Sequence, residues 1–280
     1  MRESYGWLRD LPDIRDFTLT TLERSGLDLG LGELGELPDK YDIGLNHSLP
    51  AIGNQGKLGS CTAWAGTYMY QAFLSVAGSG KADLSKLFLY KVARNLLGSK
   101  GDTGSYLRTT VQALRLFGVP PQQYYPYDIS KFDDEPGAFL YAMAQNYQAE
   151  TYLRLDPQGT TPDNVLLAIK SNLAANRSCV FGFIVYDSIS DASGKVPMPT
   201  NSDRKLGGHA VCAVGYDDHF EISGAEKKSV GAVKFACSWG AEWGEGGFGW
   251  IPYDYIRAGL AVDWWTLLSA EWLGLEQFSQ

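Results

Sequence analysis

The stretch Gln55-Gly56-Lys57-Leu58-Gly59-Ser60-Cys61-Thr62-Ala63-Trp64 decides more about this 280-residue chain than any other segment. After it, apolar residues recur at three- and four-residue spacing to about residue 76, which predicts a helix that begins near Ser60. Cys61 would then lie in the first turn of the helix, where the helix dipole favours a thiolate. This placement makes Cys61 a candidate nucleophile.

A distant histidine supplies the second part of a thiol site. His209 lies in the run Gly207-Gly208-His209-Ala210-Val211, at the start of an apolar stretch, whereas His47 and His219 lie in polar stretches that favour a solvated surface. An imidazole beside Cys61 would lower the pKa of the thiol and would protonate the leaving amine. We therefore interpret Cys61 and His209 as a nucleophile and its base.

The carbonyl attacked by such a thiolate becomes an oxyanion, which needs hydrogen-bond donors aimed at it. Gly56 and Gly59 allow the chain to curl back tightly. The side-chain amide of Gln55 and the backbone N–H of Cys61 are therefore the expected donors.

Composition bounds the partners and the compartment. The net charge is 24 − 32 = −8, and an acidic surface argues against nucleic acid and anionic membrane as partners. No stretch reaches the roughly 18 apolar residues of a membrane span. The start of the chain lacks the apolar core of a secretory signal, so we expect a cytoplasmic protein, export by a non-Sec route, or a leader removed beforehand. The cysteines, at positions 61, 179, 212 and 237, lack zinc-type spacing, and we expect no metal and no disulfide framework.

The pattern of the chain changes twice along its length. Residues 1–36 form an appendage that ends in a Gly-rich, acidic linker over 25–36. The remaining domain, 37–280, divides into a helical part (37–177) and a strand-rich part (178–280). Helices are expected near 60–76, 85–97, 105–117 and 163–175, and strands near 179–186, 209–216, 231–237, 247–251 and 261–273. This predicts an α+β fold with Cys61 and His209 on opposite sides of a cleft.

Several stretches together resemble the papain-like cysteine peptidases of the bacterial type. The strongest are residues 55–64, 206–218 and 238–250; residues 84–90 and 125–127 match more weakly, and the opening residues 6–13 resemble the short leader of bacterial members. The resemblance implies a two-lobed fold with a helical lobe and an antiparallel, β-barrel-like lobe. It also implies an endopeptidase that hydrolyses peptide bonds through an acyl-thioester, without a cofactor.

The resemblance further implies where a peptide or protein substrate binds. By position, the pocket for the second residue before the scissile bond should involve Gly104, Ser105 and Gly208, with Leu206 nearby. Gly208 leaves room and carries no charge, so we expect an apolar or aromatic side chain there. Trp239 is expected to shield the hydrogen bond of the imidazole from water.

One residue departs from the family pattern. Cys237 stands where the family has the asparagine that orients the imidazole, and a thiol is a weak acceptor. We predict a weakened but active enzyme, because the orienting group contributes less than the nucleophile and base. The main alternative is a non-catalytic or weakened papain-fold binding protein. Acyl transfer to an amine shares the same residues, and a metal site made by Cys61, His209 and Cys237 conflicts with the family geometry, which places the sulfurs on opposite sides of the ring.

The N-terminal appendage has two interpretations: ordinary surface packing, or an inhibitory segment in the groove, since papain-like enzymes are commonly made as zymogens. Trp7, Leu11 and Phe17 are its expected anchors. In the second case, the protein's own N-terminal segment occupies the groove. We expect the protein to be a monomer.

Overall fold

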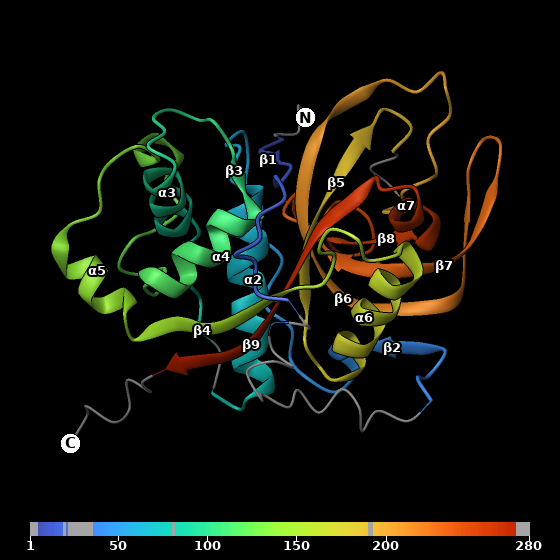
Figure 1. Ribbon diagram of the computed structural model, residues 1–280. Coiled ribbons are helices and arrows are strands. Elements are labelled where there is room, and N and C mark those ends of the chain that lie inside the picture. The colour runs from blue at the N-terminus through green and yellow to red at the C-terminus, as the bar shows by residue number, and fades with distance from the viewer. Residues whose placement is uncertain (1–4, 19–20, 22–35, 80–81, 190–192, 273–280) are drawn as a thin grey trace.

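The fold places a group of helices beside a large, twisted sheet (Figure 1). The computed structural model describes residues 5–18, 21, 36–79, 82–189 and 193–272. The expected linker over 25–36 lies almost entirely outside these residues. The α helices are α2 (Cys61–Val76), α3 (Lys86–Leu96), α4 (Leu107–Leu116), α5 (Ala138–Ala144), α6 (Pro162–Ala174) and α7 (Tyr253–Arg257), with short 3-10 turns at Ile43–Leu45 and Ile129–Lys131.

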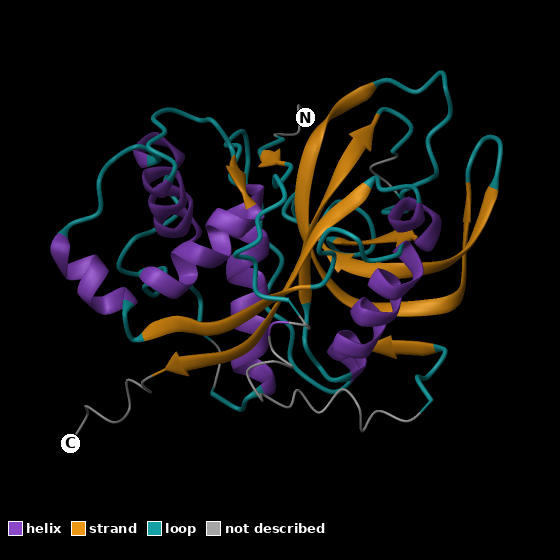
Figure 2. Ribbon diagram, viewed as in Figure 1, coloured by secondary structure: helices purple, strands orange, loops and turns teal. Residues whose placement is uncertain are grey.

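The main sheet is mostly antiparallel. Its strands are β4 (Tyr147–Arg154), β5 (Cys179–Tyr186), β6 (Lys205–Ser223), β7 (Lys228–Ala236), β8 (Phe248–Pro252) and β9 (Ala261–Trp272), in the order β4-β9-β5-β6-β7-β8, while β2 (Lys40–Asp42) pairs with β6. Two further short strands, β1 (Trp7–Leu8) and β3 (Ser105–Tyr106), form a parallel pair of their own. Figure 2 shows most of the strands on one side and α2 to α5 on the other, with β4 and the end of β9 reaching beneath these helices and α6 and α7 beside the sheet.

The predicted α+β fold with an antiparallel strand lobe is confirmed, and the sheet of that lobe is not a closed barrel. Among the described residues no pairing joins β4 to β8, so the sheet remains open. The first edge strand, β4, comes from the expected helical part of the chain and pairs with β9 over Tyr147–Arg154. The sequence analysis missed it because its residues carry no clear alternation of buried and exposed side chains.

The four predicted helices are confirmed to within about two residues at each end. For example, α6 begins at Pro162 after Thr161, whose side chain caps the helix by accepting a hydrogen bond from the Asn164 N–H. The short helices α5 and α7 were not predicted, and β6 extends well beyond the expected strand. None of the described helices has the length and apolar character that a membrane crossing requires.

The long helix α2 runs between the two sides and packs against β6. It is buried on almost every face, because its Ala, Gly and Thr residues allow close approach to its neighbours. Gly66 shows this closeness: a Cβ there would lie 2.8 Å from the methyl group of Thr110 in α4. This packing fixes the start of α2, and with it Cys61, against the sheet.

Candidate active site

The loop before α2 is held by hydrogen bonds at both ends. The backbone N–H of Gln55 donates to the carbonyl oxygen of Ser238 at 2.9 Å, and the Tyr127 hydroxyl donates to the Gln55 carbonyl at 3.0 Å. The Gly59 N–H donates to the Asp102 carboxylate at 3.0 Å. Cys61 follows as the first residue of α2 and is fully buried. The predicted position of Cys61 in the first turn of a helix is thus confirmed.

His209 lies in β6 in an aromatic enclosure. The ring of Trp239 stacks on the imidazole with centroids 4.2 Å apart, and Phe183 approaches it edge-on at 5.9 Å. The Cys237 sulfur lies 3.4 Å from Nε2 of His209. Among the described residues Nδ1 finds no hydrogen-bond partner. The sulfur of Cys237 therefore occupies the position from which the ring could be oriented.

The two candidate catalytic residues lie on elements that pack against each other, Cys61 on α2 and His209 on β6. The backbone N–H of Ala210, the residue after His209, faces the Cys61 sulfur. The side chain of Gln55 is buried nearby: its Nε2 donates to the Leu58 carbonyl at 3.0 Å, and its Oε1 accepts from the Ser238 hydroxyl. These bonds turn the amide nitrogen of Gln55 toward the loop that leads into Cys61.

The protonation states in this structure differ from the expected thiolate and imidazolium. Burial raises the pKa of Cys61 to about 11, although the N–H groups of Ala210, Gly6 and Thr62 oppose the rise. Burial also lowers the pKa of His209 to about 3. Both groups are therefore neutral at pH 7, because the charged forms lack water. The N-terminal segment lies over this site, with Gly6 against Gly59 and Trp7 against Gly208.

Residues 5–18, here called the strap, lie in the groove between the helices and the sheet. The N–H of Gly6 faces the Cys61 sulfur, and the carbonyl oxygen of Gly6 accepts a hydrogen bond from the Ser105 N–H at 2.9 Å. β1 continues this contact as a parallel partner of β3, with Trp7 opposite Ser105. The strap therefore presents the amide N–H of Gly6 to the candidate nucleophile, while the Gly6 carbonyl oxygen is bonded to Ser105.

Three of the four residues expected to form the substrate pocket border the strap. A Cβ at Gly104 would lie 2.3 Å from the Gly6 oxygen, and one at Gly208 would lie 2.6 Å from the Trp7 ring. Ser105 donates the hydrogen bond to Gly6 described above. Leu206 is largely exposed; Gly207 takes the corresponding place, because a Cβ there would lie 2.7 Å from the Tyr5 side chain.

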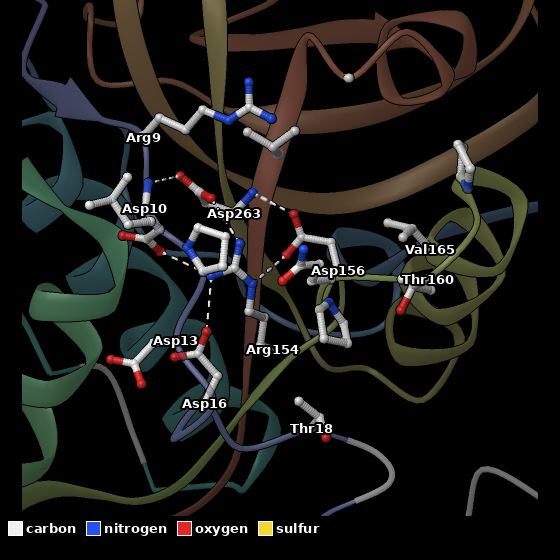
Figure 3. A pocket seen from close by; sticks show the side chains of 18 of the residues that line it. Arg9, Asp10, Asp13, Asp16, Thr18, Arg154, Asp156, Thr160, Val165 and Asp263 are labelled. Atoms are coloured by element: carbon white, nitrogen blue, oxygen red, sulfur yellow. Dashed lines mark hydrogen bonds and ion pairs between the residues drawn. The ribbon is translucent and has the colours of Figure 1, made fainter.

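An ionic cluster anchors the strap further along (Figure 3). The Asp16 carboxylate accepts two hydrogen bonds from Arg108, at 2.6 and 2.7 Å, and one from Arg154 at 3.1 Å. The Asp10 carboxylate accepts from the indole N–H of Trp265 at 3.1 Å, and its own backbone N–H donates to Asp263 at 2.7 Å. Because these pairs are largely buried, they are screened less than surface pairs.

The hydrophobic anchors of the strap are only partly those expected. Trp7 is 7% exposed, and Phe17 packs against the core beneath the sheet. Leu11, however, is 74% exposed and anchors nothing. Asp10 is an anchor instead. The sequence did not indicate this role, because the anchors were expected among the apolar residues.

Two residues of the site escaped the sequence analysis. Gly182 in β5 faces the Trp7 ring, and a Cβ there would lie 1.9 Å from Cε2. Asp263 accepts the Trp7 indole N–H at 3.1 Å. The available signal was the position of Asp263 within the apolar run Ala261-Val262-Asp263-Trp264-Trp265, because a buried charge needs partners.

Comparison with known proteins places this geometry in a family. The model of the papain family cysteine proteases matches residues 37–262. The chain belongs to the papain family of cysteine proteases. That range includes Cys61, His209 and Cys237 but not the strap, so the family assignment rests on the protease domain alone.

Two relatives resemble this papain-family protease over almost its whole length. An uncharacterized peptidase C1-like protein of Acanthamoeba polyphaga mimivirus is 32% identical, over 94% of this chain and 86% of its own. The crystal structure of xylellain, a cysteine protease from Xylella fastidiosa, superimposes with a TM-score of 0.76 at 30% identity and covers 96% of both chains. The protease and lectin-like domains of Cwp84 from Clostridium difficile share the fold, with a TM-score of 0.71 at 20% identity, over 97% of this chain and 57% of that one.

Proposed function

We propose that this chain is a latent cysteine endopeptidase in which Cys61 and His209 carry the chemistry. Once the groove is open, the Cys61 sulfur bonds to the carbonyl carbon of a peptide while its proton passes to His209. His209 then gives that proton to the departing amine as the C–N bond breaks, which leaves an acyl-thioester. Water attacks the thioester with His209 as base, and the acid product and the free thiol are released.

The surrounding residues support these steps. The Gln55 amide and the Cys61 N–H are the donors for the oxyanion, since the hydrogen bonds of Gln55 to Leu58 and Ser238 hold it beside the loop that leads into Cys61. Cys237 orients the imidazole from 3.4 Å and Trp239 covers it. A thiol holds the ring less firmly than an amide oxygen would, so we expect a lower turnover than an asparagine would give.

The latency rests on one observation, namely that the N–H of Gly6 faces the Cys61 sulfur. The carbonyl of Gly6 is turned away and bonded to Ser105. A strap in this arrangement blocks the approach of a substrate to the nucleophile. It also dries the site, which keeps the thiol and the imidazole neutral.

Three proteins test the proposal: the full chain, a chain that begins at residue 37, and a full chain with Cys61→Ala. We expect the shortened chain to hydrolyse dipeptide-amide reporters at least tenfold faster than the full chain, and the Cys61→Ala chain to show no turnover. A melting curve of the shortened chain verifies that the domain is folded. Equal rates for the full and shortened chains would refute the latency while leaving the peptidase activity intact.

The absence of turnover in a folded, shortened chain would favour a papain-fold binding protein instead. Labelling by an epoxide thiol reagent at neutral pH separates the two cases independently of the reporter sequence. A peptidase should trap the reagent on Cys61, and a binding protein should leave the thiol unmodified. Product analysis with an added nucleophilic amine distinguishes hydrolysis from acyl transfer.

A further inference from the structure

The pocket that holds Trp7 is formed by two glycines and one acid. Gly182 and Gly208 face the indole: Cβ atoms at these positions would lie 1.9 and 2.6 Å from ring atoms. The carboxylate of Asp263 accepts the indole N–H at 3.1 Å. Because glycine has no side chain, the walls at Gly182 and Gly208 leave a narrow slot for a flat ring. The Asp263 carboxylate supplies a hydrogen-bond acceptor at the far end of this slot.

Asp263 is held in place independently of the strap. Its Oδ1 accepts a hydrogen bond from Arg154 at 3.0 Å, and its backbone N–H donates to Asp156 at 2.7 Å. Its φ of +59° lies in the left-handed region, which a side chain such as aspartate tolerates better than a bulkier one. The carboxylate is therefore part of the enzyme body, and it presents Oδ2 to whatever fills the pocket.

Displacing the strap removes two donors from Oδ2 at once, namely the Trp7 indole and the Asp10 N–H at 2.7 Å. With the strap displaced, water can reach this oxygen, but a substrate side chain that fills the pocket expels the water again, and a buried carboxylate oxygen without donors is costly. A substrate side chain that ends in a carbon or an oxygen acceptor leaves that cost in place. A side chain that brings an N–H to the same point removes it.

A substrate would reach this pocket along the same strand edge. The strap adds a short strand to Ser105 beside Cys61, and extended peptides commonly bind by adding a strand to such an edge. Trp7, the strap residue that follows Gly6, places its side chain in the pocket. A peptide bound to Ser105 beside the nucleophile places one of its own side chains there.

We infer that Asp263 determines specificity by selecting tryptophan in the pocket formed by Gly182, Gly208 and Asp263. This inference rests on the proposed peptidase function and narrows the expected apolar or aromatic preference to an indole. Phenylalanine and leucine lack the donor, and an acidic side chain would face the Asp263 carboxylate.

The test compares tryptophan with 3-benzothienylalanine, which has nearly the same shape but carries sulfur in place of the N–H. Reporters with either residue at the pocket position are offered to the full-length chain with Trp7→Ala, which vacates the slot. We expect kcat/KM to be roughly tenfold to a hundredfold higher for the tryptophan reporter, since a hydrogen bond to a charged group is lost in its analogue. Equal values for the two reporters would overturn the inference.

Binding provides a second readout that needs no turnover. Peptides of the sequence of residues 5–18, with tryptophan or 3-benzothienylalanine at the position of Trp7, are titrated into the full-length Cys61→Ala, Trp7→Ala chain. The strap of this chain competes equally with both peptides, so the ratio of their dissociation constants remains meaningful. A tenfold or larger ratio supports the pocket assignment even if no reporter is cleaved, in which case the proposed function fails alone. A ratio near one overturns the assignment whatever the activity.

Asp263→Asn gives the matched variant on the protein side, because asparagine also tolerates a positive φ. We expect the tryptophan to benzothienylalanine ratio to fall several-fold in this variant, with a melting temperature that shows a folded chain. A ratio equal to that of the chain with Asp263 would show that another group accepts the hydrogen bond of the indole N–H.

Discussion

The sulfur of Cys237 lies 3.4 Å from Nε2 of His209, whereas Nδ1, the other nitrogen of the ring, has no hydrogen-bond partner among the described residues. An imidazole that accepts the proton of Cys61 through Nδ1 must carry its other proton on Nε2, and that proton points at a weak acceptor. The strength of this contact therefore contributes to how firmly the ring is held, together with the stacked ring of Trp239.

Replacing Cys237 with asparagine should therefore raise turnover. An amide oxygen forms a hydrogen bond that is stronger by about 1 kcal/mol, which corresponds to roughly a fivefold higher kcat. The measurement is kcat on a dipeptide-amide reporter with the chain that begins at residue 37, with and without Cys237→Asn. An unchanged or lower kcat would show that the thiol orients the ring as well as an amide does.

Removing the indole of the strap should activate the full-length chain. Truncating a buried tryptophan costs about 3 kcal/mol or more, which would shift the strap equilibrium by roughly a hundredfold. Trp7→Ala is therefore expected to raise the turnover of the full chain at least tenfold. Leu11→Ala is the matched control, because Leu11 is 74% exposed and its loss should leave turnover unchanged. Equal rates for both variants would contradict the anchoring role of Trp7.

The latency should also depend on pH, with the strap held more tightly in acid. Burial, followed by the charge of Asp10, raises the pKa of Asp263 from 3.8 to about 7 while the strap is docked. The pKa of Asp10 is raised as well, chiefly by burial. The groups facing Asp263 are Asp10 on the strap, Arg154 at the end of β4 and Asp156 just after it, and they border an open cavity of about 920 Å³ that water can enter.

The direction of this effect follows from proton linkage. Releasing the strap hydrates Asp263 and removes Asp10 from it, so the pKa of Asp263 falls and the closed form binds more protons than the open form. The closed form has its full advantage below about pH 4. The ratio of closed to open chains then falls as the pH rises towards about 7, by up to about tenfold per pH unit for one proton. The turnover of the full chain, divided by that of the chain beginning at residue 37, should be smaller at pH 5 than at pH 8. A ratio that is constant or larger at pH 5 would contradict this coupling.

Arg154 should be essential for stability, because it is the buried counter-charge of the cluster. It contacts Asp16 at 3.1 Å, Asp156 at 3.1 Å and Asp263 at 3.0 Å. Arg154→Leu leaves these carboxylates without their shared partner, and breaking a buried pair in this way typically costs about 3–5 kcal/mol. Denaturant unfolding of the full chain measures the change.

The control for that experiment is Arg15→Leu. Arg15 is exposed, and among the described residues it forms an ion pair only with Asp13, at 2.6 Å. The free energy of unfolding of the Arg15→Leu chain should therefore not change measurably. A comparable loss of stability in both variants would show that the cluster around Arg154 contributes no more to the free energy of unfolding than an exposed ion pair does.

The sequence by itself determined the fold class, the family and the candidate nucleophile. Helix periodicity after Ser60, the run around His209 and the substitution at Cys237 are local patterns, and local patterns can be read without knowledge of long-range contacts. The α helices α2, α3, α4 and α6 were found for the same reason. The edge strand β4 was missed because its residues carry no clear alternation of buried and exposed side chains, and its partner β9 lies more than a hundred residues away.

Only the tertiary structure decided where the N-terminal segment lies. Trp7 and Asp263 are separated by 256 positions, and no periodicity connects an indole near the start of a chain with an acid near its end. The same holds for the neutral state of Cys61 and His209, because burial by a distant segment sets their pKa values. Chemical identity is written in the order of residues, whereas water exclusion and charge pairing depend on which residues the fold brings into contact.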